Sequence, residues 1–266
     1  MNQDPSDRWL SGDPYERYVG RWSRRVAPRF LAWLGVAPAR RWLDVGCGTG
    51  ALSAAILAGC APASVIGIDP SEGFLGRARQ QLADRIVLHR ATANEIPLDD
   101  AVVDATVSAL VLNFVPDELA ALGEMARVTV DGGTIGAYVW DYAEKMELIR
   151  LFWDAAVELD PQAAQLDEGV RFPLCRPDAL ALLFTRAGLQ RVEVSAIEIA
   201  TPFSDFEDYW HPFLGGQGPA PTYAMSLNET SRTRLRDHIR ARIPLQSDGS
   251  ASLTARAWAV RATVSK

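Results

Sequence analysis

Short apolar segments alternate with helical patterns between Arg41 and Val139. A parallel sheet whose strands are connected by helices has this alternation, because each strand is buried and each helix covers a face of the sheet. The pattern therefore predicts an α/β fold. The predicted strands are Trp42–Val45, Val65–Ile68, Ile86–Arg90, Ala105–Val111 and Thr134–Val139.

Two of the connecting helices have a recognisable start. Ser71 and Asp117 carry side chains that cap helix N-termini by accepting a hydrogen bond from a backbone N–H. Apolar residues follow both at helical spacing. Those behind Ser71 are Phe74, Ala78 and Leu82. Those that we expect to be buried behind Asp117 are Leu119, Leu122 and Ala126.

The alternation changes after Val139. The segment 201–225 is rich in proline, glycine and aromatic residues and separates the last two apolar runs, which predicts an insertion before a final strand. We expect a doubly wound, mostly parallel seven-stranded sheet with helices on both faces and an inserted helical lid before the last strand. The later elements are predicted helices near 144–159, 178–187 and 227–243, and strands at 192–199 and 253–264.

Charge and composition exclude several partners. The net charge is −6 and the sequence pI is near 5.2, so the chain lacks a global positive field that would attract nucleic acid. The longest apolar stretch, Ala105–Val115, is interrupted by polar residues and is too short to span a bilayer. Three widely spaced cysteines and a polar N-terminal region predict a cytoplasmic chain without a structural metal.

A glycine cluster follows the first predicted strand. Gly46, Gly48 and Gly50 lie between that strand and an alanine-rich helix, where the backbone turns sharply and can approach a ligand closely. Gly46, Gly48 and Ala51 also satisfy the G-x-G-x-x-G/A pattern of NAD or FAD sites, so the cluster alone does not distinguish these cofactors. A third interpretation of the cluster is a structural glycine turn that binds no ligand.

Two carboxylates flank this turn. Asp44 lies inside the strand, two residues before Gly46, where a buried carboxylate needs a donor such as a ligand ammonium or loop amides. Asp69 ends the second strand, 19 residues after Gly50, where a carboxylate can accept hydrogen bonds from ribose hydroxyls. Dinucleotide cofactors need the second acid but not the first.

With these residues, LDVGCGTG and GIDPS resemble the first two motifs of class I S-adenosylmethionine-dependent methyltransferases, of the small-molecule, type 11 kind. The resemblance extends over residues 15–140 and implies a Rossmann-like fold and S-adenosylmethionine as cofactor. Thr92, Asn113 and Asp131 depart from it, since Asp, His and Pro are frequent at these positions. The implied cofactor residues are Tyr18, Arg21, Asp44, Gly46, Cys47, Gly48, Gly50, Asp69, Pro70, Thr92, Ala93, Asn94 and Leu110.

The resemblance divides the chain into three parts. Residues 1–40 would form an N-terminal helical cap, residues 41–200 with 250–266 the cofactor domain, and residues 201–249 the substrate lid. The N-terminal segment resembles a leader that folds over the cofactor in one group of these enzymes. An amphipathic helix that packs Val26, Phe30 and Trp33 on the domain explains it equally well.

Methyl transfer to a small, apolar or aromatic metabolite, by a monomer or homodimer, is the expected function. His211 and Asp141 are the candidate catalytic residues, although a surface or packing role for His211 and a helix cap at Asp141 are the simpler readings. An NAD-dependent oxidoreductase and a cofactor-binding protein without turnover are the alternatives. The candidate substrate contacts are Asn113, Trp140, Tyr209 and Trp210.

Overall fold

The fold is described from a computed structural model, for residues 16–216 and 218–266. The predictions for residues 1–15 lie outside this part of the chain. The chain divides into two compact units. The glycine-loop unit comprises Ser23–Val139, Leu174–Ile197 and Ala257–Lys266. The described part of the aromatic unit comprises residues 16–22 with Trp140–Pro173 and Glu198–Arg256.

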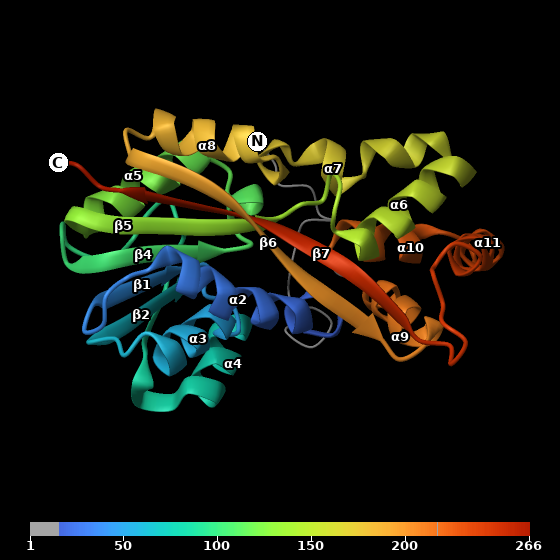
Figure 1. Cartoon of the computed structure of the whole chain (residues 1–266), viewed down its shortest axis with the longest axis horizontal. Coiled ribbons are helices and arrows are strands. Elements are labelled where there is room, and N and C mark those ends of the chain that lie inside the picture. The colour runs from blue at the N-terminus through green and yellow to red at the C-terminus, as the bar shows by residue number, and fades with distance from the viewer. Residues whose placement is uncertain (1–15, 217) are drawn as a thin grey trace. The chain divides into compact units, whose positions relative to one another are not determined.

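Seven strands form a single sheet in the order β3-β2-β1-β4-β5-β7-β6 (Figure 1). The pairs β1–β2, β1–β4, β2–β3 and β4–β5 are parallel, and β7 is antiparallel. This order confirms the predicted doubly wound, mostly parallel fold. The strands are β1 (Arg41–Val45), β2 (Ser64–Asp69), β3 (Val87–Arg90), β4 (Val103–Ala109), β5 (Thr129–Trp140), β6 (Gln190–Phe203) and β7 (Ala251–Thr263).

Helices cover both faces of the sheet in the glycine-loop unit. Figure 1 shows α2, α3 and α4 on one face and α5 and α8 on the other. Leu43, Ile68 and Ile135 belong to the core that this packing buries. The helices are α2 (Arg21–Leu34), α3 (Ala51–Gly59), α4 (Glu72–Leu82), α5 (Glu118–Val128) and α8 (Pro177–Arg186), with the short turns η3 (Ala83–Arg85) and η4 (Leu112–Phe114).

Both predicted N-caps are confirmed. The Ser71 hydroxyl accepts a hydrogen bond from Phe74 N at 3.4 Å, and the Asp117 carboxylate accepts one from Ala120 N at 2.9 Å. The predicted burial of Leu119 is wrong, because this side chain is 39% exposed. The face of α5 that packs on the sheet instead carries Ala121, Leu122, Met125 and Val128.

Strand β4 ends two residues earlier than its apolar pattern predicts. Leu110 has φ +63°, a left-handed conformation that an extended strand cannot contain. Its N–H still donates to Tyr138 O at 2.8 Å, so the chain leaves the sheet there while the apolar run continues into η4. Apolar sequence continues past this point because Leu112 is buried in the turn.

The aromatic unit contains the part of the chain whose pattern was irregular. Its residues include 201–249, the predicted lid, together with 140–173, which the sequence had placed in the cofactor domain. Residues 23–34 of the predicted N-terminal cap belong to the glycine-loop unit. The elements of the aromatic unit are η2 (Glu16–Gly20), α6 (Glu147–Leu159), η5 (Pro161–Gln165), α7 (Glu168–Arg171), η6 (Pro173–Cys175, which ends in the other unit), α9 (Phe206–Trp210), η7 (His211–Gly215), α10 (Pro219–Ser226) and α11 (Glu229–Arg240).

No helix within residues 16–216 and 218–266 is long and apolar enough to cross a membrane. In the same residues, no group of three or more His, Cys, Asp and Glu side chains is arranged to hold a metal ion.

Candidate cofactor site and family

The glycine turn after β1 is built from backbone conformations that glycine adopts most easily. Gly46, Gly48 and Gly50 have φ values of +70°, +55° and +91°. A Cβ atom on Gly46 would lie 2.4 Å from Val111 Cγ2, and one on Gly50 would lie 2.8 Å from Leu82 Cδ1. Gly46 and Gly50 are therefore required by packing as well as by backbone angle.

Gly48 differs from its two neighbours. A Cβ atom built on it would have no atom of the described chain within 4 Å. Space therefore adjoins the turn at Gly48, so a ligand can approach the backbone there.

Asp44 is a fully buried carboxylate beside this turn. Its Oδ2 accepts a hydrogen bond from Ser53 Oγ at 2.6 Å, whereas Oδ1 has no hydrogen-bond partner in the part of the chain that the structure describes. Burial raises the pKa of Asp44 to about 7, and the hydrogen bond from Ser53 lowers it. A buried acceptor without a donor is unfavourable, so this oxygen is suited to a donor that a ligand brings.

Asp69 shapes the turn from the end of β2. Its Oδ2 accepts from Gly48 N at 3.0 Å and its Oδ1 accepts from Ser71 N at 2.8 Å. Burial raises the pKa of Asp69, while these two N–H groups lower it. Each carboxylate oxygen has a second lone pair, so Asp69 can still accept hydrogen bonds from a ligand hydroxyl.

The side chain of Cys47 packs against the sheet. A Cβ atom on Gly67 would lie 2.9 Å from Cys47 Sγ, so the thiol fills the space that this glycine leaves on β2. Burial and the nearby Asp44 and Asp69 carboxylates raise the pKa of Cys47, which makes it a poor nucleophile. Its backbone N–H donates to Ile68 O at 2.9 Å and fixes the turn.

The remaining residues predicted for the cofactor site have separate positions. Pro70 follows Asp69, and its carbonyl accepts from Arg90 Nε at 3.2 Å. The loop from Thr92 to Asn94 follows β3, and Asn94 Nδ2 donates to Asp117 O at 2.6 Å. Within this loop, Ala93 packs against the core of the glycine-loop unit.

Tyr18 and Arg21 are engaged within the aromatic unit. Arg21 Nη1 donates to Asp208 Oδ1 at 2.7 Å, and its guanidinium lies 4.9 Å from the centre of the Phe203 ring. Tyr18 is buried, with its ring 5.3 Å from that of Phe213. A cofactor role for these two residues stays a prediction.

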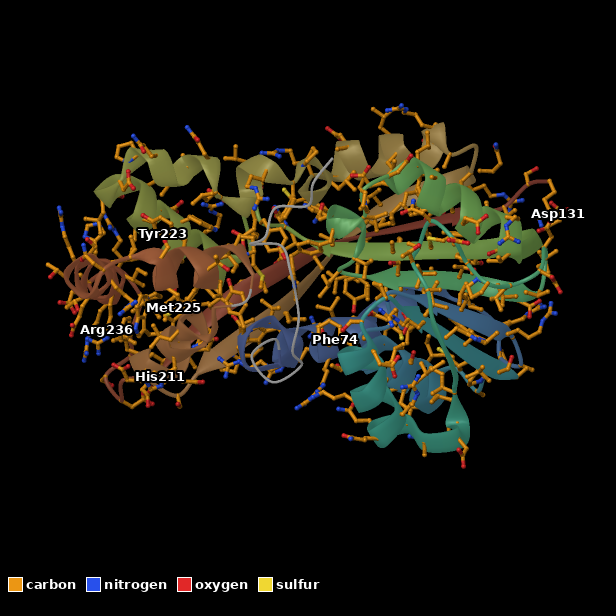
Figure 2. All side chains as sticks on the ribbon, turned by 180° about the vertical axis from the view of Figure 1, so that it is seen from behind. Phe74, Asp131, His211, Tyr223, Met225 and Arg236 are labelled. Carbon is orange, nitrogen blue, oxygen red and sulfur yellow. The ribbon has the colours of Figure 1, made fainter. Side chains whose placement is uncertain are left out.

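The two candidate catalytic residues have different surroundings. His211 is exposed, with 70% of its side chain accessible and Glu207 at 3.8 Å (Figure 2). Asp141 is buried and accepts from Arg256 Nε at 2.6 Å and from Glu144 N at 3.0 Å. This geometry favours a structural role for Asp141, although α6 begins only at Glu147 and the residue is not its N-cap.

The predicted substrate contacts are divided between the units. Trp140, Tyr209 and Trp210 are buried in the aromatic unit, where Tyr209 Oη donates to Leu148 O at 2.9 Å. Asn113 lies in η4 of the glycine-loop unit, and its Oδ1 is buried without a hydrogen-bond partner in the described residues. These aromatic residues are packed in the unit and Asn113 retains an unused acceptor, and a substrate role for all four stays a prediction.

Ser53, Ser71 and Val111 are site residues that the sequence pattern did not identify as such. Ser53 is a buried polar residue in the otherwise apolar α3, which is the signal that could have paired it with Asp44. The contribution of Ser71 comes from its backbone N–H, and that of Val111 from packing against Gly46. Neither of these two contributions can be predicted from the sequence.

Comparison with known proteins finds methyltransferase relatives. A family model described as a methyltransferase domain matches residues 43–136. An uncharacterized methyltransferase of Mycobacterium bovis is 38% identical over 126 residues, which is 47% of this chain and 48% of that protein, so the chain spans about half the length of this curated relative. The malonyl-[acyl-carrier protein] O-methyltransferase of Geobacter sulfurreducens is 32% identical over 204 residues, covering 74% of this chain and 71% of that protein.

Solved structures share the fold. A putative methyltransferase from Bacillus halodurans superposes with a TM-score of 0.60 at 14% identity, covering 90% of this chain and 99% of that one. Phosphoethanolamine N-methyltransferase 2 of Haemonchus contortus, solved with S-adenosyl-L-methionine, gives a TM-score of 0.57 at 14% identity over 91% of this chain and 53% of that one. The chain belongs to the S-adenosylmethionine-dependent methyltransferases that have the class I, Rossmann-like fold and a type 11 methyltransferase domain.

Proposed function

We propose that this chain transfers the methyl group of S-adenosylmethionine to a small apolar or aromatic molecule. The observation that carries the proposal is the buried Asp44 Oδ1, which lacks a donor beside the glycine turn. When bound, the cofactor supplies a methyl group on a sulfonium, which a nucleophilic atom displaces in line. A dinucleotide offers no ammonium group to this oxygen.

The residues of the glycine-loop unit fit such a cofactor. Asp44 would accept from the ammonium group of its methionine part, and Asp69 would accept from the ribose hydroxyls through the lone pairs that the loop N–H groups leave unused. The open space beside Gly48 would hold the part of the cofactor that approaches the backbone of the glycine turn. Together these residues bind and orient the cofactor.

The aromatic unit supports the acceptor part of the proposal. Phe152, Phe213 and Tyr209 pack with ring centres 4.6 and 5.3 Å apart, and Trp153 and Tyr223 extend the cluster. Aromatic side chains of this density exclude water and offer flat faces to an apolar ligand. A nucleophilic acceptor in such surroundings needs positioning more than a strong base.

Calorimetric titration of the purified chain with S-adenosylhomocysteine tests the cofactor. We expect a dissociation constant in the micromolar range, about −8 kcal/mol, and no measurable heat with NAD. Binding of NAD without binding of S-adenosylhomocysteine would establish the oxidoreductase alternative. Methyl-labelled S-adenosylmethionine with a metabolite mixture then identifies the acceptor, and cofactor binding without any transfer would favour a protein that binds but does not turn over.

Replacing Gly48 by alanine tests the position of the ligand. The variant adds one methyl group in the open space, at a positive φ that destabilises alanine by about 1 kcal/mol. We expect affinity for S-adenosylhomocysteine to fall at least about tenfold.

Gly132→Ala is the matched control for this substitution. Gly132 has φ +73° and likewise no described atom within 4 Å of its would-be Cβ, but it lies in β5, away from the turn. The two variants should lose similar thermal stability, and only Gly48→Ala should lose affinity. If both variants bound S-adenosylhomocysteine with equal affinity, the ligand would not lie beside Gly48.

A further inference from the structure

Glu168 is a buried carboxylic acid in the aromatic unit, in the first position of α7. It is 2% exposed. The Trp153 indole N–H donates a hydrogen bond to its Oε2. Removing a carboxylate from water is expensive unless a cation or several donors compensate.

The backbone around Glu168 is held rigidly by its neighbour. Asp167 Oδ1 accepts from Arg150 Nη1 at 2.8 Å, and Oδ2 accepts from Arg150 Nη2 at 2.6 Å. Asp167 Oδ1 also accepts from Gly169 N at 2.8 Å. Gly169 is packed so closely that a Cβ atom on it would lie 2.7 Å from Tyr142 O. The position of Glu168 is therefore fixed by contacts that do not neutralise it.

No ion pair to Glu168 is formed by the residues that the structure describes. Arg150 is the nearby cation, but its guanidinium is committed to Asp167 and to Asp154, 3.1 Å away. Burial raises the pKa of Glu168 to about 7, with Asp167 contributing in the same direction and the Trp153 hydrogen bond and Arg150 opposing it.

Tyr142 adjoins the same turn of the chain, since its carbonyl O would lie 2.7 Å from a Cβ atom on Gly169. The pKa of Tyr18 is raised by burial and then by the charges of Glu168, Tyr142 and Tyr209, so each of these three groups lies close enough to Tyr18 to interact with it. Tyr142 packs on Phe172 with ring centres 5.9 Å apart. Aromatic faces attract cations, and phenol oxygens accept hydrogen bonds from them.

We propose that Glu168, with Tyr18, Tyr142 and Tyr209, recognises an ammonium group, and that the methyl acceptor is therefore a small aromatic or apolar amine. This inference rests on the proposed function for its biological meaning. An ammonium ion supplies the cation that the buried carboxylate lacks, and tyrosine rings attract such a charge. A neutral ligand of the same shape offers neither advantage.

Binding of phenethylamine, compared with 2-phenylethanol, tests the proposal. Each probe is titrated into the full chain while the tryptophan fluorescence is followed, because Trp153 contacts Glu168 directly. We expect phenethylamine to bind at least about tenfold more tightly than the alcohol, and Glu168→Gln to abolish this preference. Equal binding of the two probes by the unmodified chain would overturn the proposal.

Glu158→Gln is the matched control. Glu158 lies on α6 of the same unit, but it is exposed and pairs with Arg242 and His238. This variant should keep the preference for the amine. Loss of the preference in both variants would show that general negative charge, and not Glu168, attracts the probe.

The pH dependence of the unmodified chain gives a second test that needs no variant. With the pKa of Glu168 at about 7, the ionised fraction increases about tenfold between pH 6 and pH 8, and phenethylamine affinity should rise equally. The charged groups that act on Glu168 are Asp167 and Arg150, which are ion-paired to each other, and the pKa of the neighbouring Tyr18 lies well above this range. A pH-independent affinity contradicts the proposal.

These readouts are separate from the cofactor. If the chain binds S-adenosylhomocysteine but shows no preference for the amine, the proposed function stands and the ammonium site is wrong. If the chain prefers the amine but does not bind S-adenosylhomocysteine, the ammonium site stands and the proposed function is wrong.

Discussion

Asp69→Ala is expected to lower the affinity for S-adenosylhomocysteine by about 30- to 1000-fold, or ~2–4 kcal/mol. The carboxylate is the acceptor that would hold the ribose hydroxyls, and alanine leaves those donors unpaired. It also leaves Gly48 N and Ser71 N without their present acceptor. We therefore expect the free energy of unfolding to fall as well, by about 1–3 kcal/mol.

Two measurements separate these effects. Calorimetric titration well below the melting midpoint gives the affinity of the folded protein, and chemical unfolding gives its stability. Asp69→Asn keeps one acceptor oxygen and should have an intermediate affinity. Asp84→Ala, an exposed position in η3, should leave both quantities unchanged. If Asp69→Ala lost stability while its affinity stayed within threefold, Asp69 would serve only to shape the turn.

The elements of the glycine-loop unit could be predicted because their signals are local. Ser71 and Asp117 cap helices through hydrogen bonds within three residues, and short, mainly apolar runs mark strands β1, β2 and β5. The prediction failed where a neighbouring element decides the outcome. Leu119 sits at helical spacing, yet the face of α5 that packs on the sheet is rotated away from it.

The organisation of the aromatic unit could not be predicted, because its contacts join distant parts of the chain. Arg21 pairs with Asp208, which is 187 residues away, and Tyr209 donates to Leu148 O, 61 residues away. Glu168 lies among short helices and turns without periodicity, so its burial has no signature in the sequence.

The candidate site shows the same division. The glycines and Asp69 follow a local pattern, and the structure brings Gly48 and Asp69 together through a direct hydrogen bond at 3.0 Å. From its position inside β1, Asp44 was expected to need a hydrogen-bond donor, and its Oδ1 has none among the described residues. His211 and Asp141 were proposed from residue type and position alone. His211 is exposed, with Glu207 3.8 Å away, and the buried Asp141 is paired with Arg256.

Arg256→Met is expected to destabilise the folded chain by about 3–5 kcal/mol, because it leaves the buried Asp141 carboxylate without its cation. Asp141 is 1% exposed and the Arg256 side chain 12%, and the Nε–Oδ2 distance is 2.6 Å. Methionine preserves most of the apolar stem of Arg256, so the loss reports chiefly on the charge. Urea unfolding of the purified variant measures it.

Lys145→Met is the contrasting substitution on the same unit. Lys145 Nζ lies 3.0 Å from Glu198 Oε1, but the two side chains are 48% and 45% exposed, so water compensates for the lost pair. We expect a change of at most about 1 kcal/mol. Similar losses in both variants would contradict the special role of burial at Asp141.

The double variant Asp141→Asn with Arg256→Met shows whether the pair acts as a unit. Removing both charges avoids the unpaired buried carboxylate, so the double variant should be more stable than Arg256→Met alone. Asp141→Asn should also retain methyl transfer in proportion to its folded fraction. Asp141 follows β5 and accepts hydrogen bonds from Arg256 of β7 and from Glu144 N, so its expected role is structural. A fully folded Asp141→Asn variant that had lost methyl transfer would instead identify Asp141 as the base that the sequence proposed.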